Sequence, residues 1–244
     1  MNKNSELIKR RSIKCQFHAH CSPDPMDPIK YDAQDLIKAA AKLNYDVLTI
    51  TCHNKIIFSK KLEKYAHKKG LLLIPGIETE INKKHILIIN ADKSAEEIHT
   101  FEDLKKYKTD HPESLIVAPH PFFPGINSLK KDLIKNIDLF DAIEYSFCYT
   151  KLKNYNLKAE AVAKKYSKPI IATSDCHFLQ QLPLSFAMLD SHKDIPSIIN
   201  AIKKNKIKNY HFPLSIFKLT AILSKMFMMQ IKKINYRKTS KKIA

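Results

Sequence analysis

Short apolar runs alternate with longer segments of helical spacing along most of the chain, from about residue 13 to residue 207. The short runs are rich in Ile, Leu and Val, and the longer segments include 31–44 and 152–166. This alternation predicts strands separated by helices, which is typical of βαβ units and of a mostly parallel sheet, open or closed into a barrel. The predicted strands are Ile13–Phe17, Val47–Ile50, Leu71–Ile74, Ile86–Ile89, Leu115–Ala118, Ala142–Ile143, Ile170–Ala172 and Phe186–Leu189.

Five of these strands lead into residues that can bind metal ions. The residues are His18 and His20, His53, Glu78, His120, and Asp175 with His177. In a parallel barrel the carboxyl ends of the strands meet at one face, where the active site lies. The spacing His18-Ala19-His20 also places two imidazoles on the same side of an extended strand. The pattern therefore predicts a metal site at that face.

The types of donor favour a catalytic site over a structural one. Histidines with Asp and Glu, and no paired cysteines, suit a Zn, Mn or Fe centre. The candidates are too many for one ion, and a carboxylate such as Glu78 or Asp175 could bridge two ions. Taken singly, each residue has an ordinary interpretation, and His85 could equally belong to a solvated basic turn. It is the convergence of five strand ends that favours the metal site.

Composition excludes several classes of protein. The chain has 244 residues but only three glycines, all isolated. A Rossmann turn or a P-loop needs clustered glycines, so we expect no nicotinamide or flavin cofactor and no P-loop nucleotide site. The five cysteines lack C-x-x-C spacing, and the N-terminus lacks the apolar core of a secretory signal. We therefore expect a cytoplasmic chain with reduced thiols and a basic leader at residues 1–12.

The motifs around the candidate ligands resemble, in order, those of the PHP (polymerase and histidinol phosphatase) family. The matching segments are His18-Ala19-His20 with Ser22-Pro23-Asp24 for the opening motif, Thr51-Cys52-His53 for T-D-H, Pro75-Gly76-Ile77-Glu78 for P-G-x-E, Lys84-His85-Ile86-Leu87 for G-H-I-L, His120-Pro121 for H-P, and Ser174-Asp175-Cys176-His177 for S-D-x-H. The resemblance extends from about residue 13 to residue 207. It implies a distorted (β/α)7 TIM-like barrel, which we place at residues 13–209.

The resemblance also implies two or three divalent ions, Zn, Mn or Fe, with Mg as a further candidate. His18, His20, Glu78 and Asp175 would hold the first ion. Glu78 would bridge to a second ion held by His85 and His120, and His53, His177 and Asp24 would hold a third. Members of the family include phosphatases of histidinol phosphate and nucleotides, exonucleases on short oligonucleotides, and domains of replicative polymerases.

The chain departs from the family pattern at several positions. Cys52 stands where T-D-H has its Asp, and Pro183 stands where a glycine is usual. The loop after His20 is short, so Asp27 is a substitute for Asp24 as a ligand. The cysteines beside the ligands, Cys21, Cys52 and Cys176, should point to the opposite strand face and pack in the core.

From the resemblance we expect a metal-dependent phosphoesterase. A metal-activated water would attack the phosphorus of a nucleotide, of another small phosphorylated metabolite, or of a short nucleic acid. His53 or His177 could protonate the leaving group, and no single lysine stands out as a phosphate ligand. Two alternatives remain: a metal-dependent amide or ester hydrolase, and a catalytically silent PHP-like scaffold that binds nucleic acid or a membrane through its tail.

The net charge of +18 is concentrated at the C-terminal end. Residues 195–244 contain 12 Lys or Arg and no Asp or Glu, whereas the rest of the chain has 30 basic against 24 acidic residues. We predict a basic amphipathic helix and tail at 210–244, in which Lys218, Lys225 and Lys232 recur every seven residues. This segment could cover the barrel or a partner protein, place the chain at an anionic membrane surface, or attract nucleic acid.

Overall fold

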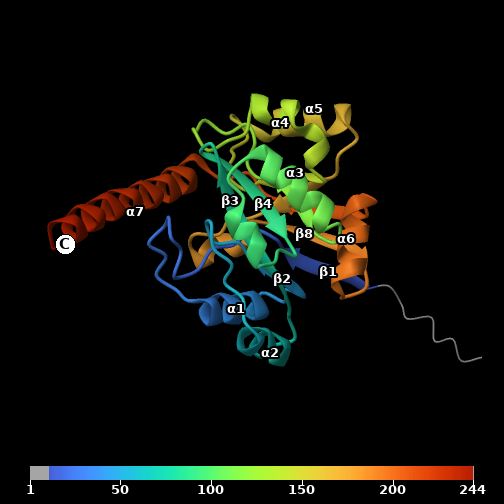
Figure 1. The fold of residues 1–244 in the computed structure, drawn as a ribbon, viewed down its shortest axis with the longest axis horizontal. Helices are drawn as coiled ribbons and strands as arrows, with labels where there is room; N and C mark the ends of the chain where they lie inside the picture. The colour runs from blue at the N-terminus through green and yellow to red at the C-terminus, as the bar shows by residue number, and fades with distance from the viewer. Residues whose placement is uncertain (1–10, 244) are drawn as a thin grey trace, which may run out of the picture.

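The computed structural model describes residues 11–243, which form nine strands and seven α-helices in one α/β fold (Figure 1). The strands are β1 Arg11–Gln16, β2 Val47–Ile50, β3 Leu72–Ile81, β4 Lys84–Ile89, β5 Leu115–Ala118, β6 Ala142–Ser146, β7 Ile170–Thr173, β8 Ser185–Ser191 and β9 Ile207–His211. The α-helices are α1 Ala33–Lys42, α2 Lys60–Lys68, α3 Phe101–Asp110, α4 Lys131–Lys135, α5 Asn156–Lys165, α6 Ile195–Lys203 and α7 Ile216–Ile243, and short 3-10 helices lie at Lys93–Glu97, Ile137–Leu139 and Leu179–Leu184. All eight predicted strands are present.

The strands form a single sheet in the order β7-β6-β5-β4-β3-β2-β1-β8-β9. Four neighbouring pairs are parallel and four are antiparallel, so the sheet is less parallel than the alternation predicted. The β3–β4 pair shows the reason. The two residues between these strands, Asn82 and Lys83, have φ angles of 50° and 64°, as a tight hairpin turn requires. A two-residue turn returns the chain antiparallel, whereas a parallel partner needs a long crossover.

The sheet curls almost into a closed barrel. Beyond the ends of β1 and β7 the chain forms a bridge between Ala19 and Cys176, in which the His20 N–H donates to the Cys176 carbonyl at 3.0 Å. Farther along β7, the side chain of Asn209 from β9 accepts a hydrogen bond from Ala172 N and donates one to Ile170 O. These contacts join the two edges of the sheet, and the predicted barrel-like α/β class is confirmed.

Strand β9 has no counterpart in the predicted pattern. Its sequence Ile207–His211 is only partly buried and lacks an apolar run, because it lies at the edge of the sheet beside β8. It extends past position 209, where we placed the end of the barrel. At the other end, residues 1–10 of the predicted leader lie outside the described residues, and Arg11 and Ser12 already belong to β1.

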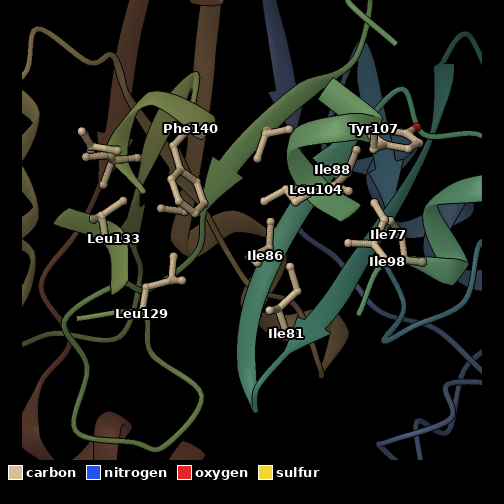
Figure 2. Packing of buried hydrophobic residues seen from close by; sticks show 14 of the residues in the cluster. Ile77, Ile81, Ile86, Ile88, Ile98, Leu104, Tyr107, Leu129, Leu133 and Phe140 are labelled. Atoms are coloured by element: carbon tan, nitrogen blue, oxygen red, sulfur yellow. The ribbon is translucent and has the colours of Figure 1, made fainter. Parts of the chain in front are cut away.

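Two apolar layers cover the sheet, and an inner cluster fills it. The inner cluster joins strand residues such as Ile13 and Leu87 to Ile198 and Ile202 of α6. On the outside, α3, α4 and α5 pack over β3 to β6 through buried apolar side chains, many of which Figure 2 shows. α1 and α2 cover β2 and β3 through a third cluster. Helices therefore stabilise the strands whose ends carry the predicted ligands.

Helix starts follow from side-chain caps in the sequence. Thr100 and Asp103 form a reciprocal capping box at the start of α3, and Asp32 and Asp194 accept backbone N–H groups at the starts of α1 and α6. Such caps satisfy N–H groups that have no partner inside the helix. They fix where each connection from a strand end turns into its helix.

Gly76 in β3 is required by close packing, which gives a first prediction. A Cβ atom at this position would lie 2.4 Å from Thr49 Cγ2 and 3.1 Å from the Ile88 carbonyl oxygen. Overpacking of this kind costs about 1–3 kcal/mol, so we expect Gly76→Ala to lower the free energy of urea unfolding by that amount. Adding Thr49→Ser removes the nearest methyl group and should recover part of the loss. Equal stabilities of Gly76→Ala and wild type would contradict this packing.

Candidate metal centre

The predicted ligands converge at one end of the barrel. His18 and His20 follow β1, His53 follows β2, Glu78 lies in β3, His85 in β4, His120 after β5, and Asp175 and His177 after β7. Each of the six histidines and Glu78 is at most 8 % exposed. His85 is near the start of its strand, but β4 is antiparallel and its start lies beside the end of β3. The hairpin therefore brings His85 to the same end as the other ligands.

Glu78 lies at the centre of this group. Its Oε2 is 3.1–3.3 Å from the Nε2 atoms of three histidines, His18, His20 and His53. Its Oε1 is 2.8 Å from His85 Nδ1 and 3.2 Å from His120 Nε2. The two oxygens of one carboxylate thus face two separate sets of imidazoles. This is the arrangement expected of a carboxylate that bridges two ions.

The donors predicted for the first ion lie together. Single ligand atoms of His18, His20, Glu78 and Asp175 lie within 4.8 Å of one another. Asp175 Oδ1 is buried and makes no hydrogen bond within the described part of the chain, although three imidazole nitrogens lie 3.3–3.4 Å away. Its φ of 41° is unusual for a residue other than glycine. A buried carboxylate oxygen directed at imidazoles without a hydrogen bond fits an ion ligand.

Two further groups of donors adjoin the first. One contains His53, Glu78 and His85, and the other contains His20, His53 and His177. His120 contacts Glu78 on the His85 side, as the predicted second ion requires. The described residues therefore offer donors for two or three ions. The assignment of particular ligands to particular ions stays a prediction.

The two candidate acids after His20 occupy different positions. Asp24 is fully buried and lies behind the imidazoles, where it contacts Nδ1 of His20 and of His53 and accepts three backbone N–H groups. Asp27 lines the pocket, with Oδ2 2.9 Å from His177 Nε2. Burial raises the pKa of Asp27, but the His177 imidazole outweighs it and holds that pKa at about 2. The position facing the pocket belongs to Asp27, and Asp24 as a direct ligand stays a prediction.

Glu144 is a candidate positioning residue that the strand-end pattern missed, because it lies inside β6. Its Oε1 is 2.7 Å from His18 Nδ1 and accepts the Thr173 hydroxyl, and its Oε2 accepts the His120 N–H. A carboxylate on one ring nitrogen fixes the tautomer and aims the other nitrogen at the ion. The signal in the sequence is a lone Glu within the apolar run Ala142–Tyr145.

Charges in the cluster balance one another. Burial lowers the pKa of His18, but the carboxylates of Asp175, Glu78 and Glu144 outweigh it and hold that pKa well above its usual value. Burial would likewise raise the pKa of Glu78, yet the surrounding imidazoles hold it well below normal. For His85, burial prevails and lowers the pKa. The Glu78 carboxylate therefore remains charged, as an ion ligand must be.

The cysteines next to the ligands pack in the core, as predicted. Cys21, Cys52 and Cys176 are fully buried among the residues that pack under α1. Cys52 Sγ lies 3.8 Å from Cys21 Sγ and 3.2 Å from the Cys21 carbonyl oxygen. The Cys52 thiol stands where the resemblance expects an Asp. It is directed at Cys21, in the segment after β1, and away from the candidate ion ligands.

A pocket of about 520 Å³ opens onto the cluster. Both candidate proton donors, His53 and His177, line it, and Lys83 is the one Lys or Arg among its described lining residues. Asn127 lies on the loop after β5, and Met226 comes from α7. The sequence gave no reason to select Lys83, because lysines are common throughout the chain.

Comparisons with known proteins agree with this geometry. Residues 153–207 match the family described as PHP-associated. The fold is similar to a two-domain protein of Bacteroides vulgatus that contains a predicted PHP-like metal-dependent phosphoesterase (TM-score 0.64, 17% identity, 82% of this chain and 65% of that chain). The chain therefore has the fold of PHP-like proteins.

Other structures share the PHP fold. They include the lesion-specific endonuclease EndoQ of Pyrococcus furiosus (TM-score 0.61, 17% identity, 83% of this chain and 59% of that chain) and PsfC of Pseudomonas syringae (TM-score 0.59, 14% identity, 90% and 98%). The chain thus spans less than two thirds of the Bacteroides protein and of EndoQ. No curated protein sequence matches it significantly.

The contact between Glu144 and His18 gives a second prediction. Replacing Glu144 by Gln removes the charge that fixes the His18 ring, so we expect Mn²⁺ affinity, measured by calorimetry, to fall about 10- to 100-fold. Glu160→Gln, at an exposed position of α5, is the matched control and should bind Mn²⁺ like wild type. An unchanged affinity in a folded Glu144→Gln protein would show that Glu144 does not position a ligand.

Proposed function

We propose that this chain is a metal-dependent phosphoesterase of the PHP family. The observation that carries the proposal is the position of Glu78, whose two oxygens face separate groups of histidines. A bridging carboxylate between imidazole sets is suited to a pair of ions, and paired ions are typical of phosphoryl transfer. A catalytically silent scaffold would not need all these buried ionisable groups, which are costly to desolvate.

The donor set fits divalent ions such as Zn, Mn or Fe, because it combines imidazoles and carboxylates without a thiolate. His18, His20, Glu78 and Asp175 would hold one ion, and Glu78 with His85 and His120 a second. His53 and His177 are the donors available for a third. When bound, such ions supply an activated water and neutralise charge on phosphoryl oxygens.

The residues of the pocket wall would orient the substrate. Lys83 sits at the tip of the β3–β4 hairpin, where its ammonium can pair with a phosphate beside the cluster. Asn127 adds an amide from the opposite loop. A volume of about 520 Å³ suits a small ligand. We therefore propose a phosphomonoester of a nucleotide or another small metabolite, or the end of a short oligonucleotide, as substrate.

Related structures support the proposal without naming the substrate. The Bacteroides protein contains a predicted phosphoesterase, and EndoQ is an endonuclease. Another endonuclease Q structure holds a 27-mer duplex with an abasic lesion at its active site (TM-score 0.60, 15% identity, 83% of this chain and 60% of that chain). Phosphate esters are thus the substrates to try first.

The central test is phosphate release from a pool of nucleotides, nucleoside bisphosphates and sugar phosphates with Mn²⁺ or Zn²⁺ supplied. We expect wild type to release phosphate and the His18→Ala/His20→Ala variant to lose at least about a thousandfold in rate, because two ligands of the first ion are gone. Release by a chelator-treated enzyme should return when the ion is added back. A folded, ion-loaded wild type that releases no phosphate, and cleaves no short oligonucleotide, would refute the proposal.

Lys83 provides a prediction specific to substrate binding. Loss of a charge-assisted contact to phosphate costs roughly tenfold, so Lys83→Ala should raise KM by about that factor for the substrate found above. Circular dichroism should show an intact fold, because the Lys83 side chain is exposed. Lys106→Ala, on the exposed side of α3, removes an equal charge and should leave KM unchanged. Equal KM values for both variants would mean that Lys83 does not contact the phosphate.

A further inference from the structure

Helix α7 carries two apolar stripes on opposite sides. The inner stripe contains four partly buried residues at spacings of three and four, Leu219, Ile222, Met226 and Met229. Met226 lines the metal pocket, and Met229 lines a neighbouring pocket beside Phe178 and Leu179. This stripe therefore faces the catalytic end of the barrel.

The outer stripe has no cover within the described residues. It contains Ile216, Phe217, Leu223, Phe227 and Met228, which are 47–87 % exposed. Ile216, Leu223 and Phe227 are seven and four residues apart and lie on one side of the helix, and Phe217 and Met228, eleven residues apart, lie about 100° further round, so the five share one broad exposed face. Figure 1 shows α7 leaving the barrel as a single long helix. A contiguous exposed apolar strip of this kind marks an interaction surface.

The start of α7 is fixed to the catalytic end. Leu214 is buried and its N–H donates to the Tyr149 carbonyl, while the Tyr149 hydroxyl lies 2.8 Å from His211 Nδ1. Farther along, Lys225 Nζ lies 5.9 Å from the centre of the Phe178 ring. These contacts orient α7, so that its outer stripe faces away from the barrel.

The charge of this segment identifies the partner. Residues 195–244 contain 12 Lys or Arg and no Asp or Glu. Lys218 and Lys225, seven residues apart, are both exposed and lie along one edge of the outer stripe. Pairing this stripe with that of a second copy would place lysine beside lysine with no carboxylate in the segment, which is unfavourable. An anionic surface would instead accept both the apolar strip and the cations.

We propose that the outer stripe of α7 docks on an anionic phospholipid surface. Within residues 11–243 no helix has the length and hydropathy needed to cross a bilayer, so α7 would lie along the surface. Phe217, Leu223 and Phe227 would enter the headgroup boundary, and the lysine side chains would reach the phosphates. Because the inner stripe lines the pocket, docking would hold the metal centre next to the membrane. The inference does not depend on the reaction catalysed there.

Vesicle co-sedimentation tests this directly, with the full chain and two kinds of vesicle. Wild type should bind vesicles of phosphatidylcholine and phosphatidylserine in equal parts, and bind pure phosphatidylcholine much more weakly. Phe217→Ser/Phe227→Ser should weaken binding to the anionic vesicles by roughly tenfold or more. Ile134→Ser/Leu157→Ser removes two exposed apolar residues from α4 and α5 and should bind like wild type.

Each outcome decides the question. Absence of wild-type binding, or equal loss in both double variants, would overturn the proposal. So would a dimer in sedimentation velocity that Phe217→Ser/Phe227→Ser dissolves, because the stripe would then bind a second copy. Phosphate release from a soluble substrate is measured in parallel. An inactive wild type that still binds vesicles would refute the phosphoesterase and leave the docking surface standing.

Discussion

The site depends on the burial of one carboxylate, Glu78, among five imidazoles. A buried charge is tolerated only where opposite charges or hydrogen bonds compensate its desolvation. Here the compensation comes from histidines that follow β1, β2 and β5 and from His85 near the start of β4. The buried charge is therefore stable only while these strands keep their relative positions. The hairpin turn at Asn82-Lys83 places His85 against Glu78, and Gly76 lets β3 approach Thr49 closely enough to pair with β2.

Behind the imidazoles lies a second set of carboxylates that controls their orientation. Glu144 contacts Nδ1 of His18, and Asp24 contacts Nδ1 of His20 and His53. In all three cases Nε2 is left directed at Glu78. Ring orientation is thus fixed before any ion is bound, which lowers the cost of assembling the coordination sphere. Cys52 takes no part in this arrangement, since it packs against Cys21.

Helix α7 connects the metal centre to the surface of the molecule. One side contributes Met226 to the pocket, and the other side exposes aromatic and aliphatic residues beside lysines. The two interpretations of the C-terminal segment, a cover for the barrel or an interfacial helix, are therefore compatible. A helix that is apolar nearly all round can pack against the barrel with one side and against a second surface with the other.

Local sequence patterns predicted most of the strands and most of the candidate ligands of this protein. Apolar runs located eight strands, because burial on a sheet demands them. Residues at strand ends identified Glu78, Asp175 and five of the histidines, whereas His85 was selected only through the motif resemblance. Local patterns could not locate β9, whose edge position needs no apolar run, nor the antiparallel direction of β4. Only the tertiary structure showed that Glu144 meets His18 across 126 residues, that Asp27 faces the pocket while Asp24 lies behind it, and that Met226 reaches the metal centre. Those contacts depend on how the barrel closes, and closure depends on pairings between segments far apart in the chain, which no local spacing encodes.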